Sequence, residues 1–273
     1  MVLTMGCVLA AGAQAAQPSA GCGQGAPAPT QLQLEVAGRN RQAIVVPPPA
    51  YQPRHPYPLV LAFHGRTNGN VQVRDYFGLE VPGFPAILVY PAGLQDARGR
   101  YSWSDPGDSP ESLRDFALFD ALLDRLEAGY CVDRDAVFVV GHSLGASFAN
   151  SLACHRADRI RGLGSVAGGI VGRRCGRAPA SLLLHNPRDA AVPVAEGLTA
   201  RAALLGRAPA SASPLVLEGD YACVEDRGGA DPVLWCPYHE NLNRRGRFYP
   251  HQWPRMAGAT IMNFFAGLTL PGR

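Results

Sequence analysis

One five-residue segment, Gly141-His142-Ser143-Leu144-Gly145, combines residue types and a spacing that could carry out nucleophilic chemistry. It directly follows an apolar run over residues 136–140 and precedes a helix-compatible run over residues 146–155. A serine between two glycines, set between a strand and a helix, is typical of a nucleophile elbow, a sharp turn that exposes the serine hydroxyl. The pentapeptide alone is a weak signal in a glycine-rich chain, so the prediction rests on its context.

A serine hydroxyl becomes a good nucleophile only when a base removes its proton, so a histidine and an orienting carboxylate are required. In chains with this type of elbow, the acid and then the histidine follow the serine in sequence. Asp189 lies in a loop after the apolar run 182–184, and His251 lies near the C-terminus. Either residue alone would more often have a structural role. Their order after the elbow predicts Ser143 as nucleophile, His251 as general base and then acid, and Asp189 as the carboxylate that orients the imidazole.

The loop His64-Gly65-Arg66-Thr67 follows the apolar run 59–63 and is a candidate part of an oxyanion hole, a pair of amides that stabilises a negatively charged oxygen. We expect the first amide from Leu144 and the second from Arg66, with Thr67 as the alternative. Gly65 would let the backbone approach a substrate closely, which makes His64 and Gly65 candidate substrate-binding residues. A simple strand-to-helix turn is the other interpretation of this loop.

The elements that must position these residues are predicted from apolar runs and their spacing. Continuous apolar runs cover residues 59–63, 86–90 and 136–140, and shorter ones cover 182–184 and 215–217. Such runs are typical of strands buried on both faces of a parallel sheet. Residues 32–36 and 41–46 predict a hairpin, and residues 112–128 and 257–268 predict helices. Strands that alternate with helices indicate one α/β domain.

The composition excludes several classes of protein. All 25 basic residues among the 273 are arginine, so the chain lacks the lysine amine that a P-loop ATPase or a Schiff-base enzyme needs. With 47% hydrophobic and 17% charged residues, the chain can build a sizeable core and does not have a disordered composition. A net charge of +3 does not favour a nucleic-acid partner, and no apolar run of membrane-spanning length follows the N-terminus.

The N-terminus has the composition of a targeting segment. Residues 1–16 are apolar and end in Ala-Gln-Ala-Ala, which is typical of signal-peptide cleavage, although no arginine precedes the apolar run. We therefore expect a signal peptide over residues 1–16, a flexible leader over 17–30 and a catalytic domain over 31–273, in a secreted or periplasmic protein. The alternative is a buried first helix of a cytosolic protein.

Removal of this signal peptide would remove Cys7 and leave an even number of cysteines, which in an exported chain indicates three disulfides. Cys223 and Cys236 are the favoured pair because they close a short loop. Cys131 and Cys154 bracket one strand–helix unit and could form a second pair. Cys22 with Cys175 would then follow by elimination. Reduced, buried thiols are the alternative, and the lack of a C-x-x-C spacing argues against a zinc site.

Seven segments, in this order, resemble a family of secreted esterases that joins feruloyl esterases to polyhydroxybutyrate-depolymerase-like proteins within the α/β-hydrolases. They are Phe63-His64-Gly65-Arg66-Thr67-Asn68, Val89-Tyr90-Pro91-Ala92-Gly93, Trp103-Ser104-Asp105, the Ser143 elbow, Ser165-Val166-Ala167-Gly168-Gly169, the Asp189 loop and His251-Gln252-Trp253-Pro254. The resemblance implies an α/β-hydrolase fold with an eight- or nine-stranded, mostly parallel sheet, no cofactor and a Cys223–Cys236 disulfide.

The sequence departs from the family pattern in two places. Asn186-Pro187 stands where relatives tend to carry Gly-Thr, which could reshape the Asp189 loop. Residues 237–250 form a longer insertion before His251, either a lid or rim of the site or a plain surface loop.

The resemblance implies a serine esterase that acts on an ester substrate, and we favour feruloyl or related hydroxycinnamoyl esters of plant polysaccharide. Trp103 and Trp253 could form aromatic walls for such an acyl group, or could pack in the core. Depolymerisation of polyhydroxybutyrate or its oligomers is the main alternative, and acetylxylan or short-chain esters stay open. A non-catalytic binding protein on a hydrolase scaffold is the alternative from another class. The sequence leaves the oligomeric state open.

Two groups of arginines could bind an acidic polysaccharide or could simply form a solvated face. They are Arg156, Arg159 and Arg161, and Arg173, Arg174 and Arg177. Among the other polar residues, we interpret His142, His155 and His239 as structural or surface histidines.

Overall fold

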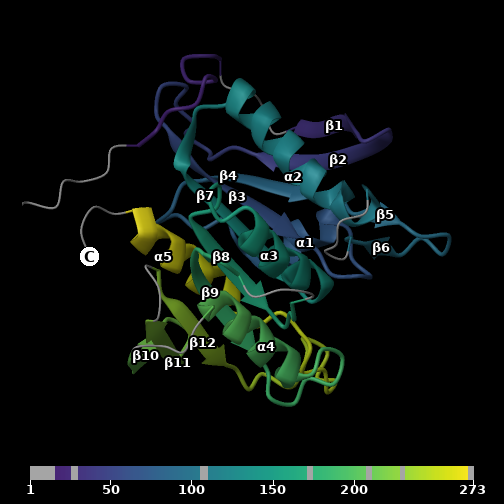
Figure 1. Ribbon diagram of the computed structural model, residues 1–273, viewed down its shortest axis with the longest axis vertical. Coiled ribbons are helices and arrows are strands. Elements are labelled where there is room, and N and C mark those ends of the chain that lie inside the picture. The colour runs from purple at the N-terminus through teal and green to yellow at the C-terminus, as the bar shows by residue number, and fades with distance from the viewer. Residues whose placement is uncertain are drawn as a thin grey trace, which may run out of the picture.

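A single sheet of ten strands, with helices on both faces, forms the body of the protein (Figure 1). The computed structural model describes residues 16–25, 30–104, 110–170, 175–206, 211–227 and 231–269. Residues 1–15 of the predicted signal peptide, residues 26–29 of the predicted leader, Asp105, Arg173 and Arg174 lie outside these ranges.

The order of strands across the sheet is β1-β2-β4-β3-β7-β8-β9-β12-β11-β10. The strands are β1 Thr30–Val36, β2 Arg39–Val46, β3 Tyr57–Phe63, β4 Ile87–Pro91, β7 Val132–His142, β8 Gly162–Val166, β9 Ala180–His185, β10 Ser211–Leu217, β11 Tyr221–Arg227 and β12 Val233–Pro237. The six central strands, from β4 to β12, are parallel, and two antiparallel strands follow on each side. The predicted α/β class is therefore confirmed. The implied count of eight or nine strands is too low, because the β10–β11 hairpin adds two antiparallel strands beside β12.

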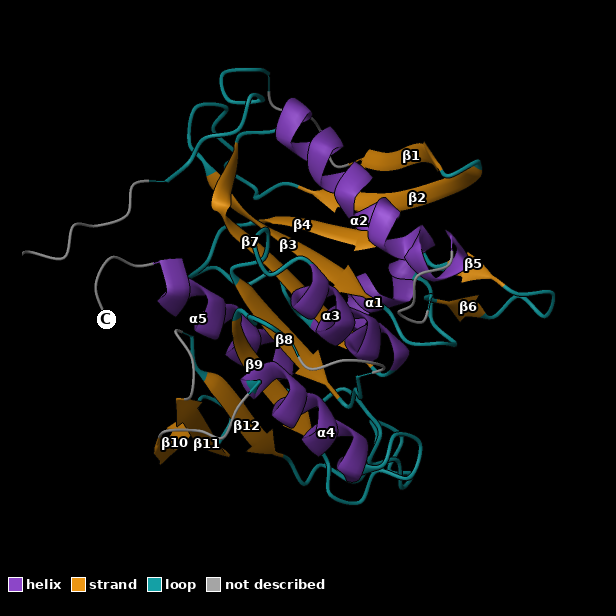
Figure 2. Ribbon diagram, viewed as in Figure 1, coloured by secondary structure: helices purple, strands orange, loops and turns teal. Residues whose placement is uncertain are grey.

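Helices cover the two faces of the sheet unequally (Figure 2). The helices are α1 Asn70–Phe77, α2 Pro110–Gly129, α3 Leu144–His155, α4 Val194–Leu205 and α5 Ala257–Thr269. One core layer joins the sheet to α2, α3 and α4, and the other joins it to α1 and α5. Leu59 and Leu61 of β3 belong to the first layer and Val60 to the second, since successive side chains of a strand point to opposite faces. No helix in the described ranges is long and apolar enough to span a membrane.

The prediction of a buried parallel strand at residues 215–217 is wrong. These residues belong to β10, the edge strand, which pairs with β11 alone and in the antiparallel direction. Val216 is 72% exposed there. An apolar run of three residues does not distinguish an edge strand from a central one, because burial depends on what covers it.

Functional loops gather at one edge of the sheet because parallel strands end at the same edge. Strands β3, β7, β9 and β12 are parallel, so the loops that follow them share the carboxyl edge. A short hairpin of β5, Leu94–Gln95, and β6, Tyr101–Ser102, projects beside this edge (Figure 1). The opposite edge, where the parallel strands begin, is called the amino edge below.

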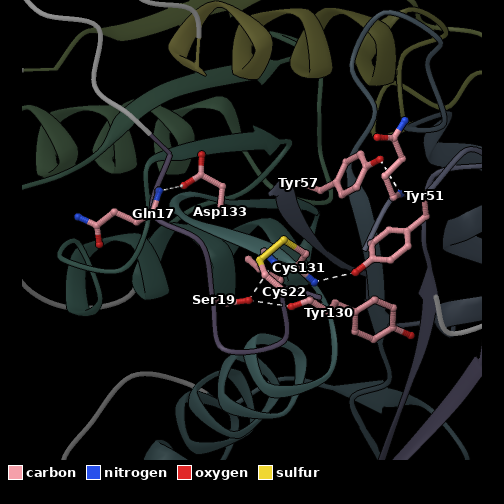
Figure 3. Close-up of a disulfide and its surroundings, with 10 residues drawn as sticks. Gln17, Ser19, Cys22, Tyr51, Tyr57, Tyr130, Cys131 and Asp133 are labelled. Carbon is pink, nitrogen blue, oxygen red and sulfur yellow. Dashed lines mark hydrogen bonds between the residues drawn. A yellow bond between two sulfur atoms is a disulfide. The ribbon is translucent and has the colours of Figure 1, made fainter. Parts of the chain in front are cut away.

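The first described segment, residues 16–25, lies against the amino edge rather than forming a flexible leader (Figure 3). The amide of Ser19 donates to the carbonyl of Val132 (2.9 Å), and its hydroxyl donates to the carbonyl of Tyr130 (2.7 Å). Cys22 forms a disulfide with Cys131 at the start of β7. The prediction of a flexible leader is therefore wrong for residues 17–25, because these bonds attach the segment to the sheet.

The described residues contain three disulfides, and Cys223–Cys236 is as predicted. The other two predicted pairings are wrong, because Cys22 bonds to Cys131 and Cys154 to Cys175. Cys22 bonds to Cys131 because the N-terminal segment lies against the start of β7. Cys154, at the end of α3, faces the chain that leads into β9, where the amide of Cys175 donates to Ala203 of α4.

Candidate active site

Ser143 lies in a tight turn between β7 and α3. Its φ of 57° and ψ of −124° are strained for a residue with a side chain. A Cβ on Gly141 would lie 2.3 Å from the carbonyl oxygen of Gly145, and a Cβ on Gly145 would lie 2.2 Å from that of Phe63. Both positions therefore require glycine. The turn places Ser143 at the N-terminus of α3, where unpaired amides favour negative charge.

Three predicted residues from three separate loops form a continuous chain of hydrogen bonds. The Nε2 atom of His251 lies 2.7 Å from the Oγ of Ser143, and its Nδ1 atom lies 2.6 Å from the Oδ2 of Asp189. The other carboxylate oxygen of Asp189 accepts hydrogen bonds from the amides of Ala191 (2.8 Å) and Val192 (3.0 Å). Since a carboxylate only accepts, Nδ1 of His251 carries the proton, and Nε2 is free to accept the proton of Ser143.

The carboxylate of Asp189 is held in its charged form. Burial raises its pKa, but the hydrogen bond with His251 and the amides of Val192 and Ala191 outweigh this effect, and the pKa is lowered overall. Asp189 is 6% exposed and His251 is 7% exposed. A carboxylate shielded from water interacts strongly with a positive charge that forms on the neighbouring imidazole.

The loop after β3 lies directly beside Ser143. A Cβ on Gly65 would lie 3.4 Å from the Cβ of Ser143 and 3.9 Å from its Oγ. The buried ring of His64 donates from Nδ1 to the carbonyl of Gly65 (2.7 Å) and accepts at Nε2 from the amide of Gly93 (2.8 Å). Because the carbonyl of Gly65 and the amide of Arg66 belong to one peptide plane, His64 also fixes the direction of that amide. Burial lowers the pKa of His64 to about 4, which keeps the ring neutral.

His142 is a member of the site that the sequence interpretation missed. Its Nε2 donates to the backbone carbonyl of His251 (3.0 Å), and its Nδ1 lies 3.3 Å from the hydroxyl of Tyr76. That hydroxyl in turn accepts from the side-chain amide of Asn68 (3.2 Å), in the loop after β3. Burial, and next the neighbouring His251, lower the pKa of His142 to about 3, so the ring is neutral. Its position inside the elbow was the available sequence signal.

Two more side chains hold the loop that carries His251. The hydroxyl of Tyr238 donates to the carbonyls of Pro250 (3.1 Å) and Gln252 (2.9 Å), which flank the histidine. The buried Asn186 donates to the carbonyl of Glu240 (3.2 Å) and accepts from the amide of Arg188 (2.9 Å). Asn186, the departure from the family pattern, therefore ties the acid loop to the insertion 237–250 and leaves the Asp189 contact intact.

The two candidate tryptophans pack against neighbouring aromatic side chains, with Trp103 buried and Trp253 partly buried. Trp103 is 4% exposed, stacks on Phe148 (5.3 Å between ring centroids) and donates from Nε1 to the carbonyl of His64 (2.8 Å). Trp253 stacks on Phe77 at 3.8 Å. The hydrogen bond of Trp103 fixes the carbonyl of His64, and the Trp253 ring lies edge-on to His142 at 5.9 Å.

Some candidate residues lie away from these contacts. His155 donates to the carbonyl of Ser151 at the end of α3 (2.7 Å), and His239 is exposed. A groove of about 560 Å³ lies between β2 and the β5–β6 hairpin, and none of Ser143, Asp189 and His251 lines it. In the described ranges, no group of three His, Cys, Asp or Glu residues is arranged to hold a metal ion.

The mostly parallel sheet, with a serine elbow at the end of a central strand and helices on both faces, defines an α/β-hydrolase. Within that class the chain belongs to the family described as "Putative esterase", whose model matches residues 35–235. The family model and the relatives named below support a carboxylic ester hydrolase.

Relatives of known name support this membership. The chain is 28% identical to "Feruloyl esterase D" of Neurospora crassa over 67% of this chain and 66% of that protein. It is 30% identical to "Probable feruloyl esterase C" of Aspergillus terreus over 72% of this chain and 70% of that protein. The matches thus span about two thirds of each relative.

Solved structures with the same fold have much lower sequence identity. An acetyl xylan esterase from Aspergillus awamori is 13% identical, with a TM-score of 0.62 over 87% of this chain and 99% of that chain. A ferulic acid esterase from Anaeromyces mucronatus, solved with ferulic acid, is 16% identical, with a TM-score of 0.55 over 89% of this chain and 91% of that one. At these identities, the similarities show a shared fold and no more.

Proposed function

We propose that the protein is a secreted serine esterase in which Ser143, His251 and Asp189 form the catalytic triad. The observation that carries the proposal is the continuous hydrogen-bonded chain from Oγ of Ser143 through His251 to Asp189, with distances of 2.7 and 2.6 Å. A proton can move from serine to imidazole along this chain without any rearrangement of side chains.

In the first half of the reaction, Oγ of Ser143 attacks the ester carbonyl carbon while Nε2 of His251 takes the hydroxyl proton. The carbonyl oxygen becomes negatively charged and accepts hydrogen bonds from the amides of Leu144 and Arg66, with Thr67 as the alternative donor. The amide of Leu144 is in the first turn of α3 and has no partner within the helix. His251 then gives its proton to the leaving alcohol, and an acyl-enzyme remains.

In the second half, water attacks the acyl carbon as His251 takes a proton from it. Collapse of the second tetrahedral intermediate returns that proton to Ser143 and releases the carboxylic acid. Asp189 stays charged throughout and stabilises the imidazolium that forms twice. No step in this sequence requires an amine, in agreement with a chain whose 25 basic residues are all arginine.

For the substrate, we propose feruloyl or related hydroxycinnamoyl esters of plant polysaccharide. The named feruloyl esterases of Neurospora crassa and Aspergillus terreus support this choice. Export is proposed on the basis of three disulfides, since such bonds persist in oxidising compartments. The apolar segment 1–16 would supply the signal peptide.

The test is hydrolysis of 4-nitrophenyl acetate and methyl ferulate by the wild type and by Ser143→Ala. We expect the variant to lose roughly 10⁶-fold in kcat, as in other serine hydrolases without the nucleophile. Ser151→Ala is the matched control, because Ser151 lies two turns along α3 and its hydroxyl donates to the carbonyl of Ser147 (3.1 Å), away from His251 and Asp189. Equal rates for wild type and Ser143→Ala would refute an esterase with this nucleophile.

Substrate choice is tested with the same wild-type protein. Methyl ferulate should give a higher kcat/KM than 3-hydroxybutyrate oligomers or acetylated xylan. A preference for the hydroxybutyrate oligomers would replace the feruloyl assignment with the polyester one while leaving the triad unaffected.

A further inference from the structure

Five arginines surround the carboxyl edge of the sheet and are called the rim arginines below. Arg66 follows β3, Arg188 follows β9, and Arg244, Arg245 and Arg247 lie in the loop after β12. All five side chains are exposed. Since β3, β9 and β12 end at the same edge as β7, the rim arginines lie around the mouth of the site that contains Ser143.

The rim arginines are unpaired, in contrast to the arginines that the sequence had suggested for polysaccharide binding. Across the described ranges, no carboxylate lies within 4 Å of any rim guanidinium. Each of the three sequence candidates after α3 forms an ion pair with an acid. Arg156 pairs with Asp120 (2.7 Å), Arg159 with Glu127 (3.0 Å) and Arg161 with Asp231 (2.9 Å). A paired guanidinium has little free capacity for an external anion. Of the two interpretations of Arg156, Arg159 and Arg161, polysaccharide binding is therefore disfavoured.

The positive charge of the insertion is not neutralised from within. Glu240 is the one acidic residue of the loop 237–250, and its carboxylate accepts hydrogen bonds from the amide of Arg255 (3.1 and 3.2 Å). The tight turn around Asn243 holds its neighbours in place, because Asn243 Oδ1 accepts from the amides of Arg245 (3.0 Å) and Arg247 (3.1 Å). Three like charges are thus presented together on an ordered turn.

The same loop exposes apolar and aromatic surface. Leu242, Phe248 and Tyr249 are 59%, 57% and 46% exposed. The guanidinium of Arg188 lies 4.8 Å from the centre of the Phe248 ring, and the Tyr249 ring contacts His251 edge-on at 6.0 Å. Flat rings next to free guanidinium groups suit a ligand that carries both stacking faces and negative charges.

The loop is attached to the catalytic loops and is not a detached flap. Asn186 and Gln252 both donate to the carbonyl of Glu240, at 3.2 and 2.8 Å. Figure 1 shows the segment between β12 and α5, in olive to yellow, beside the loop that leads from β9 to α4. A molecule bound on this loop would therefore also lie beside Asp189 and His251.

We propose that the rim arginines bind the carboxylates of a uronic-acid-bearing polysaccharide, the chain to which the cleaved ester is attached. Guanidinium groups pair with carboxylates through two parallel hydrogen bonds, and the faces of sugar rings pack on aromatic side chains such as Phe248 and Tyr249. A single-stranded nucleic acid offers similar chemistry. The polysaccharide is favoured because the rim encloses an ester-cleaving centre. The inference rests on the proposed function in one respect, that the ester cleaved by the protein is attached to a polysaccharide.

The test measures binding of a fluorescently labelled oligogalacturonate, without turnover, to the full-length protein by anisotropy. The variant Arg244→Gln/Arg245→Gln/Arg247→Gln should bind about tenfold more weakly, because it loses three ion pairs that are each weak on an exposed surface. The affinity of the wild type should fall as salt is added, and that of the variant should depend less on salt. Bound oligogalacturonate should also raise the KM of the wild type for methyl ferulate.

The matched control is Arg54→Gln/Arg125→Gln/Arg177→Gln, which removes the same charge at the opposite edge. These three exposed arginines precede β3, β7 and β9 and therefore lie at the amino edge. The control should bind oligogalacturonate like the wild type. Equal weakening in both variants would mean that net charge alone drives binding and would overturn the proposal.

Three further results would overturn it: no loss of affinity in the rim variant, equal binding of a neutral arabinoxylan oligosaccharide, or tighter binding of a single-stranded oligonucleotide. The last would assign the surface to nucleic acid. Because binding is measured without turnover, a protein that binds oligogalacturonate but hydrolyses no ester would leave the rim assignment standing and refute the esterase proposal.

Discussion

The two edges of the central sheet are built for different purposes. At the amino edge, bonds join segments that are far apart in sequence, including two disulfides and the ion pair between Arg161 and Asp231. At the carboxyl edge, the loops hold a strained serine, two neutral buried histidines and a ring of unpaired arginines. The amino edge is therefore cross-linked within the protein, whereas the carboxyl edge carries the site residues and presents the rim arginines to solvent.

This difference separates stability from chemistry within one domain. Parallel strands direct their carboxyl ends, and the N-termini of the following helices, toward one edge, where negative charge is favoured. The amino edge has no such role and can be cross-linked without blocking a substrate. Substitutions at the carboxyl edge should therefore reduce activity with little effect on stability, and those at the amino edge should do the reverse.

The largest expected effect after loss of the nucleophile is that of Asp189→Asn at the carboxyl edge. The amides of Ala191 and Val192 will keep the asparagine oxygen facing them, so its NH₂ group will face Nδ1 of His251. Nδ1 must then accept, and the proton moves to Nε2, which can no longer accept from Ser143. We expect kcat to fall about 10⁴-fold.

The unfolding midpoint of Asp189→Asn in urea should stay close to that of the wild type, because the substitution preserves shape and the backbone hydrogen bonds. Steady-state kinetics with methyl ferulate and a urea titration together check this. A kcat within tenfold of the wild type would show that another carboxylate orients His251.

At the amino edge, the double variant Cys22→Ala/Cys131→Ala should affect stability instead. The disulfide closes a loop with a sequence separation of 109, and its removal should lower the free energy of unfolding by about 2–4 kcal/mol. The kcat of the folded protein should not change, because Cys22 and Cys131 lie at the edge opposite Ser143. Urea unfolding and kinetics under native conditions provide the two measurements.

Cys154→Ala/Cys175→Ala is the companion variant, with a sequence separation of 21. Removal of the disulfide that closes the shorter loop should cost about 1.5 kcal/mol less than removal of the other, since the entropy of loop closure grows slowly with loop length. A large loss of kcat in either double variant, with the protein still folded, would contradict the separation of the two edges.

What the sequence could predict follows from the same geometry. The contact between Ser143, His251 and Asp189 could be predicted because a nucleophile elbow has a local pattern, after which an acid and a histidine are expected in a known order. The pair Cys223–Cys236 could be predicted because the loop between them is short. These features depend on neighbours in sequence, or on motifs whose spacing is recognisable.

Features that depend on tertiary neighbours could not be predicted. The pairing of Cys22 with Cys131 requires the path of residues 16–25 along β7, which no local pattern contains. Likewise, the sequence left open whether Arg156 binds a ligand or forms a solvated face, because its pairing with Asp120 is a tertiary contact. The rim arginines were missed because the sequence does not show that, among the described residues, no carboxylate lies near them in three dimensions.

The smallest expected effect concerns His142, which the structure places between the two halves of the site. His142→Leu removes the donor to the carbonyl of His251 and the partner of Tyr76, so the imidazole of His251 loses one of its supports. We expect kcat to fall about tenfold, equivalent to about 1.4 kcal/mol, with KM unchanged. A group that positions the base should affect the chemical step and leave binding of the ester unaffected.

The comparison with His142→Gln distinguishes positioning from general packing. A glutamine amide can donate to the carbonyl of His251 and accept from Tyr76, so this variant should recover most of the lost kcat. His239→Gln, on the exposed insertion, is the matched control and should leave kcat unchanged. If His142→Leu and His142→Gln lose stability to the same extent and neither changes kcat, His142 only fills space, and other contacts, such as those of Tyr238 and Asp189, position His251.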